Sequence, residues 1–123
     1  MPFRPKYLNL LQIRMPLPAI VSIMHRVSGA ALFLSLPLLL CWWQSSLTSI
    51  NTFSVFRGTL ALWWVKLIIL GLAWGYLHHL FAGIRHLVMD LDMATDLPAA
   101  RLSSVLVLVV SIALTVLVGA RLW

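Results

Sequence analysis

One histidine lies inside a long apolar stretch, where burying an ionisable side chain costs free energy. His79 lies near the end of the run from Leu60 to His86. A histidine at such a position usually has a function there, as a metal ligand, part of a proton path or a polar partner. Imidazole is also a common axial ligand of haem iron, so the residue suggests iron coordination. The alternative is a hydrogen-bonded packing residue.

Three glycines share a helical face with this histidine. Gly71, Gly75, His79 and Gly83 are spaced by four, and positions four apart line one face of a helix. Glycines beside a histidine make a shallow groove in which a flat macrocycle can lie close to the backbone. Small residues at this spacing also serve helix–helix packing, so both interpretations stay open.

Two further histidines compete for roles around the same face. His86 is seven residues beyond His79, about 10 Å along the helix axis, too far for both to ligate one iron. A six-coordinate haem would therefore need its second ligand from another chain, and His86 suits a propionate or a structural hydrogen bond. His78 is the rival ligand, but it projects about 100° away, with Trp74 and Arg85 rather than with the glycines. We therefore favour His79.

A second polar group lies in the first apolar run. Ser22, His25, Arg26 and Gly29 have the spacing of one helical face. A quinone headgroup has two carbonyl oxygens that accept hydrogen bonds, and its half-reduced form is negatively charged. Ser22 and Arg26 can supply a hydrogen bond and a fixed positive charge. The alternative is that Arg26 anchors to a lipid phosphate.

The composition predicts that membrane-spanning helices position these groups. Of 123 residues, 62% are hydrophobic and 10% charged, with a mean hydropathy of +1.00. About a quarter of the residues are charged in soluble domains. We expect a single membrane-anchor domain over residues 1–123, in which residues 44–58 form a polar loop. Its parts are an interfacial lead-in over 1–18 and three transmembrane helices over about 19–43, 60–87 and 102–120.

The net charge of +6 is better explained by topology than by nucleic-acid binding. The basic residues flank apolar runs and form no stripe of the kind that nucleic-acid readers carry. Six of them fall on one side of the predicted bilayer, and Arg57 and Arg121 fall on the other. This bias favours an inside N-terminus and an outside C-terminus. The single cysteine, Cys41, excludes an intrachain disulfide and an iron–sulfur site.

Two phrases carry a resemblance to a known family. SIMHRVSG (Ser22 to Gly29) and HLFAGIRHLVMD (His79 to Asp90) resemble the cytochrome b large membrane-anchor subunit of succinate dehydrogenase. The Arg4-Pro5 pair and the LNLLQIRMPLPAI segment that follows also resemble the N-terminus of the bacterial members of this family. The resemblance covers essentially the whole chain. It implies an all-α integral membrane protein of three helices, forming part of a heteromeric helix bundle in the cell inner (cytoplasmic) membrane.

The resemblance assigns roles to particular residues. It implies that His79 is an axial ligand of haem b and that the small anchor subunit supplies the other ligand. His25 and Arg26 match positions near the haem propionates, and His86 matches a histidine at the haem edge. Ser22 and Arg26 match the ubiquinone pocket. Asp90 completes the second phrase, and we expect it to cap its helix or to pair with Arg85.

The implied function is that of a membrane subunit of succinate:ubiquinone oxidoreductase, respiratory complex II. Such a subunit anchors the flavoprotein and iron–sulfur subunits, and it has no catalytic residue of its own. The chain has no flavin-binding motif and no iron–sulfur cysteines, so electrons would come from a docked soluble subunit and reduce ubiquinone. The rival interpretations are the anchor of a quinol:fumarate reductase and a haem-free structural anchor. Membrane lipid is an expected partner, and nucleic acid is not.

Overall fold

The computed structural model describes residues 14–123, which form four helices and no strand. Three of the helices are long and apolar enough to cross a membrane, with mean hydropathies of 1.6, 1.6 and 2.6 in chain order. The prediction of an all-α fold with three spans is confirmed. Residues 1–13, most of the expected lead-in, lie outside the described residues. The helices are α1 (Leu17–Ser46), α2 (Ile50–Leu60), α3 (Trp63–Asp90) and α4 (Leu97–Leu122).

Two helices begin before their predicted starts because a proline occupies their first turn. α1 includes Pro18, and α4 includes Pro98. Proline is tolerated there because the first amide groups of a helix have no intrahelical partner. Asp96 caps α4, and its side chain accepts a hydrogen bond from the Ala99 amide at 3.3 Å. Residues predicted as the end of a loop therefore start the last helix.

The predicted loop over residues 44–58 is wrong, because most of its second half is helical. α2 begins after Ser49, whose hydroxyl accepts a hydrogen bond from the Thr52 amide at 3.1 Å. The Ser49 amide in turn donates to the Thr52 hydroxyl at 3.0 Å. This reciprocal capping box satisfies two amides that a helix start leaves unpaired. The ring of Phe56 packs on Trp42 of α1, with ring centroids 4.7 Å apart.

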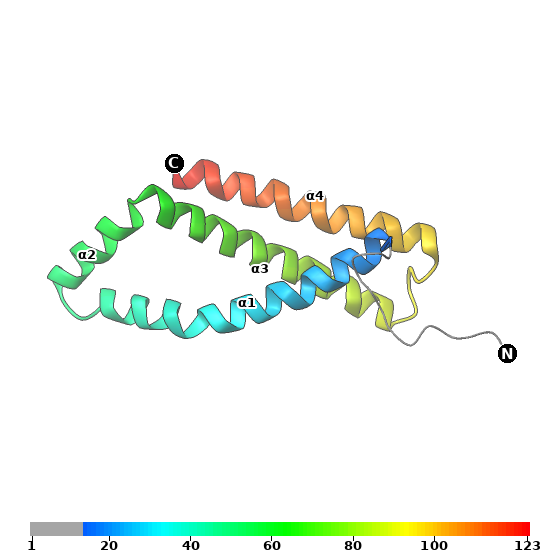
Figure 1. The fold of residues 1–123 in the computed structure, drawn as a ribbon, viewed down its shortest axis with the longest axis horizontal. Coiled ribbons are helices and arrows are strands. Elements are labelled where there is room, and N and C mark those ends of the chain that lie inside the picture. The colour runs from blue at the N-terminus through cyan, green and yellow to red at the C-terminus, as the bar shows by residue number, and fades with distance from the viewer. Residues whose placement is uncertain (1–13) are drawn as a thin grey trace.

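The three long helices lie side by side along the molecule, as Figure 1 shows. α3 packs against both α1 and α4, and α2 joins the far ends of α1 and α3. α1 begins, α3 ends and α4 begins at one end of the bundle, which we call the histidine end. The opposite end, which α2 closes, is the α2 end.

The antiparallel pair α3 and α4 is joined by polar contacts near both ends. At the histidine end, the Arg85 guanidinium donates from Nε to the Ser103 hydroxyl at 2.9 Å. At the α2 end, the Lys66 ammonium donates to the Leu122 carbonyl at 2.9 Å. Small side chains between these contacts let the two helices approach closely. The buried residues of α4 are Ala100, Ser104, Val107, Ser111 and Thr115.

The apolar core of the described residues is small. Val21, Ala82 and Val107 form it, one from each long helix. Most large apolar side chains lie on the outside, and Phe33 and Leu38 are about three-quarters exposed. An apolar surface of this extent is incompatible with water and suits helices that are surrounded by lipid or by other membrane helices.

Candidate functional site: a histidine cluster at one end of the bundle

The structure brings together three of the histidines that the sequence singles out. The rings of His25 on α1 and His79 on α3 stack with centroids 4.1 Å apart and an interplanar angle of 13°. His86 lies on the other side of His25, with centroids 5.1 Å apart. The two helical faces that were predicted separately therefore meet at the histidine end. We call these three residues the histidine cluster.

The backbone of α1 fixes the tautomer of His79. Its Nδ1 atom lies 3.0 Å from the His25 carbonyl oxygen, and the Ser28 hydroxyl donates to that same carbonyl at 2.9 Å. Because a carbonyl oxygen only accepts hydrogen bonds, Nδ1 of His79 must carry the proton. In the neutral imidazole, the lone pair is then on Nε2. An imidazole held through Nδ1 by a carbonyl is the usual arrangement of a metal-ligating histidine.

The imidazoles fit against α1 and α3 because two positions lack a side chain. A Cβ atom on Gly29 would lie 2.7 Å from Cε1 of His79, and one on Gly83 would lie 3.3 Å from Nε2 of His25. The first distance is a steric overlap. Gly29 is thus required for the position of the His79 ring, and Gly83 brings α3 close to His25.

Replacing Gly29 with alanine should displace His79 and weaken cofactor retention. The added methyl group forces the imidazole or α1 to move, at a cost of about 1–3 kcal/mol for overpacking. We expect a lower melting temperature and a reduced haem-to-protein ratio in the purified complex. Gly58→Ala is the matched control, because no atom lies within 4 Å of a Cβ atom there. Equal haem content in the two variants would contradict this role of Gly29.

The other two glycines of the predicted groove have no side chain packed against them. A Cβ atom on Gly71 or Gly75 would meet nothing within 4 Å. Both glycines line a cavity of about 230 Å³ together with Ser28 of α1. Glycines that serve packing would have a neighbouring helix against them, and within the described chain these two do not. The arrangement favours the groove interpretation, although the groove's occupant stays a prediction.

His78 and His79 are distinguished by their surroundings. The His78 side chain is 0% exposed, whereas His79 is only partly buried. His78 stacks on Trp74 of the same helix, with ring centroids 5.4 Å apart. A cofactor shared with a second chain cannot reach a side chain that this chain already encloses. The burial supports His79 as the ligand, as the sequence predicts.

Both ring nitrogens of His78 lack a hydrogen-bond partner in the described residues. An unsatisfied buried polar group costs about 1–3 kcal/mol, and the stacking on Trp74 returns roughly 0.5–1.5 kcal/mol. We therefore expect His78→Leu to keep or raise the melting temperature of the purified complex. A melting temperature lower by several degrees would show that His78 has a polar partner in the assembled protein.

Arg85 has a structural role that differs from the expected pairing with Asp90. Its side chain is 6% exposed and donates to the Ser103 hydroxyl and, at 3.4 Å, to the Ala100 carbonyl. Asp90 is exposed and ends α3. The pairing is therefore wrong, because the guanidinium faces α4 rather than the end of its own helix.

The predicted quinone ligands lie on α1 beside the histidine cluster. Ser22 is partly buried, and Arg26 is exposed next to His25. Both side chains are thus accessible from outside the chain at the histidine end, which a diffusible substrate requires. Their binding role stays a prediction.

Two polar residues of this region were missed by the sequence analysis. Ser28 lies 3.5 Å from Nδ1 of His79, and Ser103 holds Arg85. Ser28 directly precedes a glycine in the first phrase, and this position was a usable signal. No sequence signal pointed to Ser103, because its contact with Arg85 depends on how α3 and α4 align.

The fold and the cluster define a class: a three-span membrane protein with imidazoles gathered at one end of its bundle. A sequence profile of the succinate dehydrogenase/fumarate reductase transmembrane subunit matches residues 2–118. The chain therefore belongs to this family, as its two phrases predict.

Curated relatives agree with this assignment along almost the whole chain. A succinate dehydrogenase cytochrome b556 subunit of Coxiella burnetii is 40% identical over 121 residues, covering 98% of this chain and 97% of that protein. The subunit of the same name from Paracoccus denitrificans is 34% identical over 114 residues, covering 93% and 88%. That of Rickettsia felis is 29% identical over 114 residues, covering 93% and 89%.

Proposed function

We propose that this chain is the membrane-anchor cytochrome b subunit of a succinate:ubiquinone oxidoreductase. The observation that carries the proposal is the geometry of His79, whose Nδ1 is held by the His25 carbonyl, so that Nε2 would be the atom that binds iron. The name that the Coxiella and Paracoccus relatives share supports the same function. The alternative of a quinol:fumarate reductase anchor shares the family and differs in the direction of electron flow.

The residues of the histidine cluster fit a haem b. His79 would supply one iron ligand from this chain, and a small anchor subunit would supply the other. His25, Arg26 and His86 would face the propionates or the edge of the macrocycle. When bound, haem supplies a one-electron redox centre. The chain's own contribution is to orient the His79 ring through the His25 carbonyl and to exclude a side chain at Gly29.

Ser22 and Arg26 would hold the quinone. The Ser22 hydroxyl donates a hydrogen bond to one carbonyl oxygen, and the Arg26 guanidinium stabilises the negative charge that develops during reduction. Two electrons and two protons convert the quinone to the quinol. The electrons would come from an iron–sulfur subunit docked at the histidine end, with the flavoprotein subunit beyond it.

The distribution of basic residues supports an orientation with the histidine end inside. Arg14, Arg26, Arg85 and Arg101 lie towards that end, whereas Arg57, Lys66 and Arg121 belong to the other. Basic residues concentrate on the cytoplasmic side of membrane proteins. We place the protein in the cell inner membrane as a multi-pass subunit, with its N-terminus inside.

Affinity purification through this chain tests the proposed function. We expect flavoprotein, iron–sulfur and small membrane subunits in the eluate, together with succinate-dependent reduction of a short-tailed ubiquinone. Without this chain, succinate oxidation by a soluble dye should persist while quinone reduction falls to background. Efficient fumarate reduction with menaquinol and none with ubiquinol would favour the alternative. Recovery of the chain without any soluble subunit would overturn both.

A further inference from the structure

Two side chains share the carbonyl oxygen of His25. The Ser28 hydroxyl donates to it at 2.9 Å, and Nδ1 of His79 lies 3.0 Å from the same oxygen. Helix geometry also makes this carbonyl the acceptor for the amide of Gly29, four residues further along α1. A carbonyl oxygen has two lone pairs. Three donors therefore compete for an oxygen that can accept two strong hydrogen bonds.

This competition weakens the hydrogen bond that His79 makes. Each donor draws electron density from the carbonyl oxygen, so an additional donor leaves less for the others. The Ser28 oxygen also lies 3.5 Å from Nδ1 of His79, a distance at which it accepts only weakly. Competition for the carbonyl at 2.9 Å is thus the larger effect of the Ser28 hydroxyl. Without this hydroxyl, the bond from Nδ1 of His79 to the carbonyl would be stronger.

The surroundings of Ser28 offer no replacement for its hydroxyl. The side chain is 8% exposed and borders the cavity of about 230 Å³ at the histidine end. Apart from Ser28 and the Trp74 indole, no side chain that lines this cavity carries a strong hydrogen-bonding group. A buried water is held by about two to four polar partners, which this wall does not supply. Removing the hydroxyl therefore leaves the carbonyl to His79 and to the backbone of α1.

The strength of the Nδ1 hydrogen bond affects a metal bound at Nε2 of the same ring. A stronger hydrogen bond from Nδ1 makes the imidazole a more basic ligand. A more basic ligand stabilises oxidised iron more than reduced iron, because the oxidised ion carries the higher charge. The reduction potential then falls. Hydrogen bonds to the ligands are among the means by which proteins set the potentials of haem groups.

We infer that Ser28 is a positioning residue that keeps iron bound at His79 easier to reduce, because its hydroxyl shares the His25 carbonyl with the His79 imidazole. The inference rests on the proposed function and extends it to a residue that is not itself an iron ligand. Ser28 acts through the His25 carbonyl. Its removal should therefore change a reduction potential and leave the ligands in place.

Ser28→Ala in the whole purified complex tests the inference. We set the ambient potential at which half of the b-type haem in the unmodified complex is reduced. At this potential, the ratio of reduced to oxidised haem in Ser28→Ala should fall about threefold or more. The electron paramagnetic resonance spectrum of the oxidised variant should remain that of a low-spin haem, because both iron ligands are still bound.

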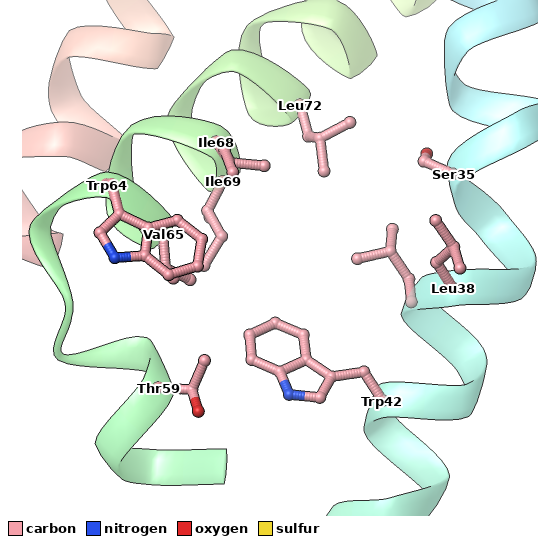
Figure 2. Close-up of a pocket in the computed structure, with 10 residues that line it drawn as sticks. Ser35, Leu38, Trp42, Thr59, Trp64, Val65, Ile68, Ile69 and Leu72 are labelled. Atoms are coloured by element: carbon pink, nitrogen blue, oxygen red, sulfur yellow. The ribbon is translucent and has the colours of Figure 1, made fainter.

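Ser35→Ala is the matched control. The Ser35 hydroxyl makes the same kind of hydrogen bond in the same helix, donating to the Leu32 carbonyl at 2.9 Å. Ser35 borders an apolar cavity near α2, where Figure 2 shows it across the gap from Leu72 of α3. No histidine lines that cavity. The ratio of reduced to oxidised haem in Ser35→Ala should therefore equal that of the unmodified complex.

The possible outcomes separate the role of Ser28 from the proposed function. An unchanged or higher ratio in Ser28→Ala, or an equal fall in Ser35→Ala, would overturn the inference. Loss of haem or a high-spin signal in Ser28→Ala would also overturn it, since Ser28 would then be needed for ligation itself. If the unmodified complex contained no b-type haem, the haem assignment of the proposed function would fail together with the inference.

Discussion

Replacing His79 with alanine should abolish the b-type haem absorbance of the purified complex. The side chain would supply this chain's iron ligand, and no other imidazole of the cluster has the same arrangement. His25 contributes the carbonyl that orients His79, and His86 lies on the far side of His25. Neither ring occupies the position of the missing imidazole. A dithionite-reduced minus oxidised visible spectrum, compared with the unmodified complex, measures the loss.

His78→Leu is the control for this experiment, because it removes the neighbouring histidine from a position that the chain encloses. Its spectrum should match that of the unmodified complex. A haem signal that survives in His79→Ala and disappears in His78→Leu would transfer the ligand to His78. No haem in the unmodified complex would leave the haem-free anchor as the correct interpretation.

The three spans could be predicted because each is a long apolar run, and hydropathy alone identifies such runs. α2 could not be predicted from its polar composition. Isolated helices of its length are marginal in water, so its stability depends on contacts with other elements. The capping pair Ser49 and Thr52 was visible in the sequence, but the packing of Phe56 on Trp42 was not.

For the candidate site too, the sequence predicts which residues share a helical face but not how the helices are placed against one another. The helical faces of His25 and His79 follow from residue spacing, but their stacking depends on how far α1 slides along α3. The burial of His78 likewise depends on how the helices pack against one another, which residue spacing within α3 does not determine. Arg85 illustrates the consequence, because sequence proximity suggested Asp90 and the helix alignment provided Ser103 instead.

The polar groups of the chain are distributed unevenly along the bundle. The histidine cluster, Ser22 and Arg26 occupy the histidine end, whereas a cavity lined by Trp42 and other mostly apolar side chains lies between α1 and α3 at the α2 end. The side chains proposed to bind a quinone headgroup therefore all lie at the histidine end.

Removing Arg26 should therefore impair quinone reduction without affecting assembly. The loss of a charge-assisted hydrogen bond in the transition state costs about 1.5–3 kcal/mol, which lowers kcat/KM roughly 10- to 100-fold. Arg26→Ala is expected to show this decrease in succinate:ubiquinone activity, and Ser22→Ala a smaller one. Electron transfer from succinate to a soluble dye should remain normal in both, since it does not involve the membrane site.

Arg101→Ala is the matched control for Arg26→Ala, because both arginines are exposed towards the histidine end and Arg101 lies on α4. It removes the same charge from the same region without touching α1. If surface charge near the membrane were the only requirement, the two variants would lose activity equally. Unchanged quinone reduction in both Arg26→Ala and Ser22→Ala would remove the quinone site from α1. A specific loss at Arg26 would place the reacting headgroup beside His25, within reach of the iron ligand on α3.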